Sequence, residues 1–295
     1  MTFSQLEIFI LVAENQSFTL TAKQLGITQS AVSHALKSLE QHWKVCLFSR
    51  NQHKIELTTI GTQLLRHAQS ILNTAQSMQQ EAAAAHGVHQ GTLRIGSFGA
   101  SASIHLLPEI LTAYRQRYPN IEIYVDEGTD EQVSQWILAK QVDVGFAVLP
   151  RQELDTFPVI QDIFVALIPK SYPIACKTKV SIAELADYPF ILTKAGSQTH
   201  VELLFKLHQI QPTIKYQLSQ LLTILNMVNI NEGVSIVADM AITPGLLALH
   251  PNVVKRPLTP NTQRHIGLAV ANKKFMSPAT KALIELAQDM FYFNK

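Results

Sequence analysis

The sequence predicts a helical N-terminal domain, a long helix, and an α/β region made of two lobes. Residues 17–41 have the pattern of two short helices joined by a tight turn. Apolar residues then recur in steps of four and three from residue 59 to about residue 86, which is typical of a helix that packs along a partner. From residue 91 strands alternate with helices, and the alternation starts again near residue 164.

The first segments of the chain read as three helices followed by a hairpin. Residues 3–14 place apolar side chains on one helical face. Ser17 is a suitable N-cap for a second helix, and Gly26 stands where a helix needs a left-handed residue to end. Thr28 can cap a third helix, whose buried stripe is Val32, Ala35, Leu36 and Leu39. The hairpin that follows has a polar, partly basic tip, as a wing beside a DNA duplex would.

The outer side of the third helix carries small and polar side chains, which is the kind of face that enters a DNA major groove. An ordinary helical hairpin with a solvated face is the alternative interpretation. The formal net charge of the chain is only +2, so attraction to phosphate must come from placement and from several copies acting together. The residues predicted to contact DNA are Thr28, Gln29, Ser30, Ser33, His34 and Lys37 on the helix and Arg50 and Lys54 on the wing.

The tract from residue 59 to residue 90 is predicted to be a linker helix and hinge. Its apolar seam is rich in Ala and its outer side is rich in Gln, so the helix needs a packing partner in water. We expect that partner to be the same helix of a second copy, and packing on its own domain is the competing account. The predicted dimer contacts are Leu64, Ala68, Ile71, Ala75 and Met78.

The remaining chain alternates strands with helices, which predicts a mostly parallel sheet. Residues 96–101 are expected to form a loop after the first strand, and residues 194–199 form a similar loop in the second half. Capping boxes begin helices after Thr129 and Ser181. Two half-units of this kind suggest two lobes that face a cleft. Strands are predicted at residues 93–95, 121–125, 142–148, 164–168, 190–193, 234–237 and 266–270.

The polar loops that follow these strands are the predicted lining of a small-molecule site. Backbone N–H groups at helix starts suit a carboxylate or another anion, although the same hydroxyls could serve only as helix caps. Lys194 and His200 could add positive charge there or could simply be exposed. The predicted site residues are Ser97, Phe98, Gly99, Ala100, Ser101, Thr129, Phe146, Ser197, Gln198 and Thr199.

Several function classes find no support in the sequence. Cys46 and Cys176 are far apart and form no disulfide framework; both are expected to be buried, with oxidant sensing by Cys176 as the weaker alternative. No metal-ligand spacing, nucleophile elbow or phosphate-binding glycine loop is present, so no enzyme, catalytic residue, metal or cofactor is expected. The amphipathic N-terminus and the lack of a long apolar run predict a cytoplasmic protein without signal peptide or membrane partner.

Short pieces of the sequence carry a resemblance to a known family. The pieces include Leu6-Glu7-Ile8-Phe9, Ser17-Phe18-Thr19, Thr28-Gln29-Ser30-Ala31-Val32-Ser33, Leu57-Thr58 and Gly61, with Leu93-Arg94-Ile95-Gly96 and Asp143-Val144-Gly145 farther along. In order and spacing they resemble LysR-type transcriptional regulators over essentially the whole chain, more loosely after residue 90. Thr21 and Ile60 depart from the family by standing where Ala is common, both at structural positions.

The resemblance implies a winged helix-turn-helix domain at residues 1–58, a linker and dimerisation helix at 59–90, and an effector-binding domain at 91–295 similar to periplasmic binding proteins. Lobe 1 would span about 91–161 plus 267–295, and lobe 2 about 162–266. The implied assembly is a homodimer, and further a homotetramer, on double-stranded promoter DNA. A small-molecule effector would control it, and RNA polymerase is a further candidate partner. A cytoplasmic small-molecule-binding module with a vestigial DNA-binding domain is the alternative, and an enzyme on an α/β scaffold is a third.

Overall fold

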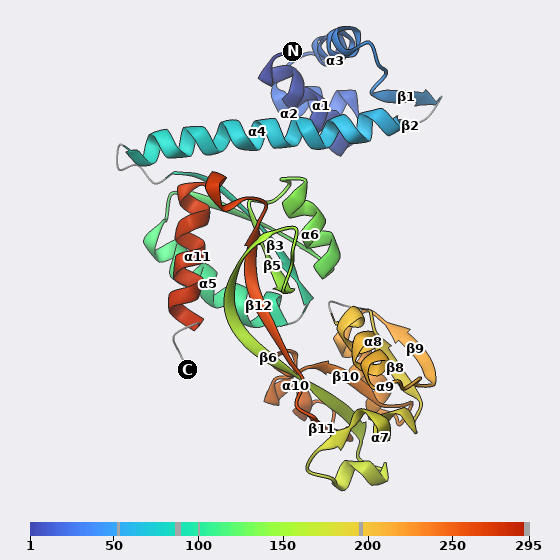
Figure 1. Cartoon of the computed structure of the whole chain (residues 1–295). Coiled ribbons are helices and arrows are strands. Elements are labelled where there is room, and N and C mark those ends of the chain that lie inside the picture. Colours follow the sequence, from blue (N-terminus) through green and yellow to red (C-terminus); the bar gives the residue numbers. More distant parts are fainter. Residues whose placement is uncertain (52–53, 86–89, 100, 195–196, 292–295) are drawn as a thin grey trace.

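The molecule has three parts, which Figure 1 shows in one view. A helical N-terminal domain packs on one end of a long helix, α4 (Thr59–Ala85), and an α/β region of two lobes lies on the other side of that helix. None of the helices in the described ranges is long and apolar enough to cross a membrane. The computed structural model describes residues 1–51, 54–85, 90–99, 101–194 and 197–291.

The N-terminal domain begins its three helices, and ends α2, at the predicted residues. Ser17 Oγ accepts the backbone N–H of Leu20 at the start of α2, and Gly26 ends α2 with φ at 65°. Thr28 Oγ1 accepts the N–H of Ala31 and so caps α3. The predicted caps and turn are therefore confirmed. The elements of this domain are α1 (Phe3–Asn15), α2 (Phe18–Leu25), α3 (Gln29–Trp43), β1 (Phe48–Asn51) and β2 (Lys54–Leu57), and β1 pairs with β2 antiparallel.

The first half of α4 belongs to the core of the N-terminal domain. Ala68 is 1% exposed and Leu64 is partly buried, both in the apolar cluster that also contains α1. Leu64 and Ala68 thus pack on their own domain, which was the alternative to dimerisation. Ala68 in particular has no surface left for contact with a second copy. Farther along the helix Ala75 is half-buried, while Ile71 and Met78 are 38% and 66% exposed. The surface that is open to a second copy therefore begins near Ile71.

Lobe 1 is built on a parallel trio of strands in the order β4-β3-β5. Thr129 and Gln132 form the predicted capping box of α6, and Ser277 accepts the N–H of Thr280 at the start of α11. The buried Tyr114 hydroxyl donates to the carbonyl of Ala279 and joins α5 to α11. The elements are β3 (Gly91–Phe98), η1 (Ser101–Leu106), α5 (Leu107–Arg117), β4 (Ile121–Gly128), α6 (Asp130–Leu138), β5 (Val144–Leu149), η4 (Lys273–Phe275) and α11 (Pro278–Phe291).

Lobe 2 packs an apolar cluster on each face of its strands. Phe164 lies in one cluster and Val165 in the other, as alternation along a strand requires. Ser181 and Glu184 form the predicted capping box of α7. The elements are η2 (Pro173–Cys176), β7 (Val180–Ser181), α7 (Ile182–Ala186), β8 (Phe190–Thr193), α8 (Gln198–Leu207), β9 (Ile214–Leu218), α9 (Leu221–Asn229), β10 (Ser235–Ala238), η3 (Asp239–Ala241), α10 (Pro244–Ala248) and β11 (Val253–Thr259).

Two long strands connect the lobes. β6 (Asp155–Pro169) and β12 (Gln263–Val270) pair antiparallel and run from lobe 1 into lobe 2, as Figure 1 shows. The large sheet has the order β4-β3-β5-β12-β6-β11-β7, and β10 also pairs with β6. The pairing of β6 with β12 shifts register between Ile266 and Gly267. The lobe boundaries expected from the sequence, after residues 161 and 266, fall inside these two strands.

Three expectations from the sequence are wrong. The large sheet is mixed, because β12 pairs antiparallel with both of its neighbours and β6 does so with β10 and β11. Half of the predicted loop at residues 96–101 is strand, since β3 continues to Phe98, and a π-helical turn begins at Ser101. Cys46 and Cys176 are exposed. Cys176 ends a single turn whose buried side chains are Ile174 and Ala175, which leaves the thiol outside.

Candidate functional site

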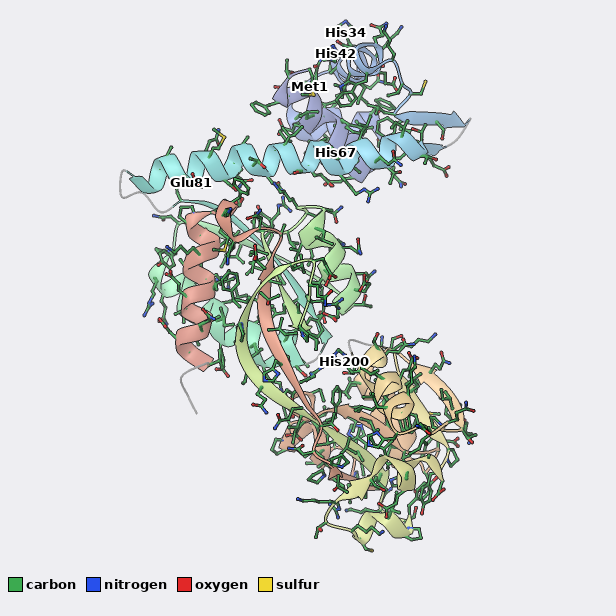
Figure 2. All side chains as sticks on the ribbon, viewed as in Figure 1. Met1, His34, His42, His67, Glu81 and His200 are labelled. Carbon is green, nitrogen blue, oxygen red and sulfur yellow. The ribbon has the colours of Figure 1, made fainter. Side chains whose placement is uncertain are left out.

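The outer side of α3 presents the residues predicted to contact DNA. Its buried stripe holds Val32 and Leu39, both 0% exposed, against the domain core. The side chains of Thr28, Gln29, Ser30, His34 and Lys37 are exposed on α3 and at its cap, and Ser33 is half-buried on the flank. Figure 2 shows His34 directed away from the rest of the molecule.

The turn before α3 is fixed by short hydrogen bonds. Thr28 Oγ1 lies 2.9 Å from Ser30 Oγ while it also accepts the cap N–H. Gln5 Nε2 donates to Ser38 Oγ at 3.2 Å and ties α1 to α3. These hydrogen bonds help to fix the start of α3 and its position on α1. In the wing, the backbones of Arg50 and Lys54 lie in β1 and β2, and their side chains are outside the described part of the chain.

A buried ion pair joins the two lobes at the base of the cleft. Arg264 on β12 donates from Nε and Nη2 to one carboxylate oxygen of Asp162 on β6, at 3.0 and 2.8 Å. The side chains of these residues are 3% and 1% exposed. Asp162 also accepts the backbone N–H groups of Ile163 and Met240, at 2.9 and 3.1 Å. The pair thus sits on the two strands that cross between the lobes.

The same guanidinium reaches one serine on each side of the cleft. Arg264 Nη2 donates to Ser101 Oγ of lobe 1 at 2.7 Å, and Nη1 donates to Ser197 Oγ of lobe 2 at 3.3 Å. Ser197 precedes α8, but its side chain makes no cap hydrogen bond to that helix. The first N–H groups of α8 therefore lack a side-chain partner at this cap. We call Arg264, Asp162, Ser101 and Ser197 the inter-lobe clasp.

Above the clasp the cleft is nearly closed. The cavity there has a volume of about 40 Å³, which leaves room for a water molecule or two and not for an organic ligand. Four of the predicted residues line it together with Arg264: Phe98, Gly99, Ser101 and Ser197.

A larger part of the cleft, about 460 Å³, lies next to the starts of α6 and α8. Three of the residues proposed from the sequence for effector binding, Thr129, Gln198 and Thr199, line it. The charged groups on its walls are Asp130, Glu131, Arg151, Lys194 and the imidazole of His200. This part of the cleft is large enough for a small metabolite.

The charges of the larger cleft are partly paired. Arg151 forms an ion pair with Asp130 and a second one with Glu131 at 3.3 Å. Burial raises the pKa of the Asp130 carboxyl, against the opposing effect of Arg151. Burial also lowers the pKa of His200, and the nearby Arg264 guanidinium lowers it further. His200 Nδ1 is buried without a hydrogen-bond partner in the described structure, and Figure 2 places this side chain at the junction of the lobes.

The other predicted ligand residues have different places. Phe146 is 1% exposed within the lobe 1 core and lines neither cavity, because β5 is buried on both faces; the expectation that it completes the pocket is wrong. Ser97 is fully buried and hydrogen-bonds to Ser103 Oγ at 2.8 Å. Ala100 lies outside the described residues.

Arg264 and Asp162 were missed by sequence reasoning. The only signal in the sequence is that each is a charged residue shortly before a mostly apolar strand segment, 163–168 for Asp162 and 266–270 for Arg264. Their separation of 102 positions in the sequence hides the pairing.

No group of three or more His, Cys, Asp or Glu side chains that could hold a metal ion occurs in the described ranges.

Comparison with known proteins identifies both the N-terminal domain and the α/β region. Residues 3–62 match the model of bacterial regulatory helix-turn-helix proteins of the lysR family, and residues 86–291 match that of the LysR substrate binding domain. The curated relative YvbU of Bacillus subtilis, an uncharacterized HTH-type transcriptional regulator, is 30% identical over 99% of both chains. LrrA of Synechococcus elongatus, a probable HTH-type transcriptional regulator, is 32% identical over 97% of this chain and 96% of its own.

Solved structures share the fold over the full length. A full-length OxyR variant from Pseudomonas aeruginosa is 22% identical, with a TM-score of 0.73 over 99% of this chain and 98% of its own. The LysR family transcriptional regulator CbnR is 23% identical, with a TM-score of 0.67 over 98% and 99% of the two chains. CbnR has also been solved in complex with its target DNA. The chain therefore belongs to the LysR family, and it is a DNA-binding transcriptional regulator with a substrate-binding domain for an effector.

Proposed function

We propose that this regulator is switched by a small anion bound between its lobes. The single observation that carries the proposal is the inter-lobe clasp, which sets a buried guanidinium against one hydroxyl from each lobe. The uncapped start of α8 and the Lys194 ammonium add positive potential on the same side of the cleft. A carboxylate or another small oxyanion is the ligand type that these groups favour. The effector residues proposed are Ser97, Gly99, Ala100, Ser101, Thr129, Ser197, Gln198 and Thr199, with Phe98 and Arg264.

The clasp also suggests how the ligand acts. A ligand that reaches Arg264 must take the place of Ser101 or Ser197, because the space above the guanidinium is only about 40 Å³. Releasing one serine changes the angle between the lobes, with β6 and β12 as the bending element. The ligand shifts this equilibrium only by the difference in its affinity for the two arrangements. The altered angle would change the spacing or bend of the bound DNA.

DNA binding is proposed to need at least two copies of the chain. The proposed groove and backbone contacts are Thr28, Gln29, Ser30, Ser33, His34 and Lys37, with Arg50 and Lys54 from the wing. One copy carries little excess charge, so two reading heads at a fixed distance are needed for useful affinity. The pairing surface proposed is the exposed part of α4 from Ile71 through Ala75 to Met78, and Leu64 and Ala68 support it from inside the domain.

A second contact between copies would give a homotetramer. The supporting observation is exposed apolar surface on both lobes. Tyr124 and Val125 are 47% and 41% exposed on the edge strand β4, and Ile214 and Leu222 are 43% and 56% exposed on lobe 2. The proposal also includes contact with RNA polymerase and a cytoplasmic location. The domain boundaries are proposed to lie near residues 58 and 90.

Footprinting on the DNA upstream of the protein's own gene tests the proposal directly. A protected site is expected, and its extent or intensity should change when a library of small carboxylates is added. A lack of protection there and across the genome would refute the regulatory role. If the DNA-binding domain is vestigial, the protein should bind DNA weakly and without sequence preference. A DNA affinity that falls steeply with salt concentration and favours one sequence would exclude that alternative.

A further inference from the structure

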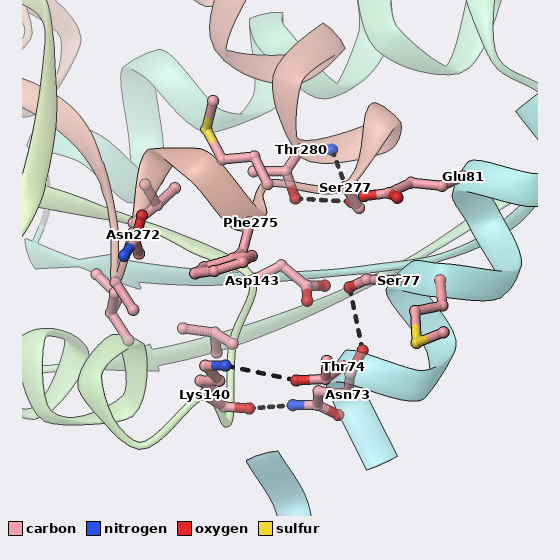
Figure 3. A pocket seen from close by; sticks show the side chains of 16 residues that line it. Asn73, Thr74, Ser77, Glu81, Lys140, Asp143, Asn272, Phe275, Ser277 and Thr280 are labelled. Carbon is pink, nitrogen blue, oxygen red and sulfur yellow. Dashed lines mark hydrogen bonds between the residues drawn. The ribbon is translucent and has the colours of Figure 1, made fainter. Parts of the chain in front are cut away.

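A second cavity lies away from both the DNA-binding surface and the inter-lobe cleft. It has a volume of about 420 Å³ and opens between α4 and lobe 1, as Figure 3 shows. One wall is the C-terminal half of α4, from Asn73 to Glu81. The opposite wall is the end of α6, the start of β5, and the turn from β12 to α11. Its size falls within the range of small-molecule sites in proteins.

The cavity is apolar on the side of the β12–α11 turn. Val142 and Val270 are buried in its floor, while Phe275 and Met78 lie on its two walls and are 70% and 66% exposed. Large apolar side chains with this much exposure gain free energy when a ligand covers them. The apolar part of a ligand therefore has the Phe275 ring to contact, while Met78 is shared with the proposed pairing surface of α4.

The charged lining of the cavity is predominantly acidic. Asp143 and Glu81 line it from opposite walls, and neither carboxylate has an ion-pair partner in the described structure. One oxygen of Asp143 accepts the backbone N–H of Arg94 at 2.8 Å. The ammonium of Lys140, which also lines the cavity, is turned to Thr74 Oγ1 at 3.4 Å. Burial raises the pKa of the Asp143 carboxyl, against the opposing effects of the Arg94 backbone N–H and the Arg94 charge.

Polar bridges join α4 to lobe 1 beside the cavity. Asn73 Nδ2 donates to the carbonyl of Lys140, and Gln141 Nε2 donates to Gln69 Oε1 at 3.3 Å. Figure 3 shows the Asn73 and Thr74 bridges to Lys140 on one side of the space. Water competes for contacts of this kind, so each bridge adds only modestly to the attachment of α4 to lobe 1. A molecule that touches both walls would oppose the separation of α4 from lobe 1.

We infer that the cavity between α4 and lobe 1 binds a small organic cation with an apolar body, and that the bound cation holds α4 against lobe 1. The ammonium lies between Asp143 and Glu81, and the apolar body covers Phe275. The site gives the regulator a second input, which acts on the linker helix directly and does not depend on the anion proposed for the cleft.

Three probes with one apolar body test this inference on the full-length protein. Cyclohexylmethylamine, cyclohexylmethanol and cyclohexanecarboxylate differ in charge and little in shape. Isothermal titration calorimetry should give an affinity for the amine about tenfold or more above that for the alcohol, with the carboxylate weakest. Hydrogen exchange of the amides of residues 73–81 should slow when the amine is added. Equal affinities, or unchanged exchange in this stretch, would overturn the inference.

Matched variants identify the charges responsible. Glu81→Gln combined with Asp143→Asn should remove the preference for the amine and leave alcohol binding unchanged, since the amide oxygen of the introduced side chain can still accept the Arg94 N–H. Glu109→Gln, an exposed site on α5, is the control and should have no effect. Should the double variant misfold, Glu81→Lys on the exposed side of α4 is decisive: it should reverse the preference toward the carboxylate, and retained preference for the amine would refute the site.

Discussion

Replacing Arg264 with Met should destabilise the region where the lobes join far more than replacing both members of its ion pair. The single change leaves the Asp162 carboxylate 1% exposed, with two backbone N–H partners and no cation. Breaking a buried pair in this way costs roughly 3–5 kcal/mol. Asp162→Asn with Arg264→Met removes both charges, and the amide oxygen still accepts the N–H groups of Ile163 and Met240. The double variant should therefore lose only about 1–2 kcal/mol of stability, mainly because the two hydrogen bonds from Arg264 to serine are lost.

Urea unfolding of the full-length protein, followed by hydrogen exchange at β6 and β12 amides, measures these costs where the pair is located. Following the local amides is necessary because a chain with several domains does not unfold as one unit. The reasoning is refuted if the single and double variants lose the same stability, or if the single variant loses less than about 1 kcal/mol, because the pair would then be exposed to water during ordinary motion.

Four further substitutions test other parts of the molecule. Ile71→Asp puts a charge on the proposed pairing surface of α4, so sedimentation should show weaker self-association and footprinting should show loss of operator binding. A monomeric variant that binds normally would contradict the proposed dimer. Gln29→Ala should reduce the preference for operator over random DNA. Lys37→Gln should weaken binding to both operator and random DNA, and it should lower the slope of log affinity against log salt concentration by about one. The lowered pKa of His200 means that the unfolded chain binds its proton more readily near pH 6.5. The Tm of the wild type should therefore fall on acidification through that range, and His200→Gln should fall less.

Local signals in the sequence determined the parts of the fold that were predicted correctly. Ser17, Thr28 and Thr129 cap helices because a hydroxyl that accepts an early N–H acts within three residues of itself. Gly26 tolerates the left-handed conformation without help from the rest of the chain. Such positions are readable because their physics involves only neighbours in sequence.

Long-range pairing explains what the sequence could not reveal. The first half of β6 was not recognised because Pro158 and Asp162 interrupt its apolar pattern. Its partner β12 supplies the reason for Asp162, through Arg264, and neither residue predicts the other. The loops beside the cleft were placed near the ligand region, yet Ser101 and Ser197 turned out to meet through that guanidinium rather than across an open pocket.

The 27 residues of α4 form an unbroken lever between the two ends of the molecule. At 1.5 Å per residue it is about 40 Å long. Its first half is fixed in the core of the N-terminal domain through Ala68, and its second half contacts lobe 1 through Asn73. A tilt of about 5° at one end moves the other by about 3.5 Å, close to the rise of one base pair. In the proposed dimer, changes too small to disrupt either domain would thus be large enough to shift the two N-terminal domains by about one base pair relative to each other on DNA.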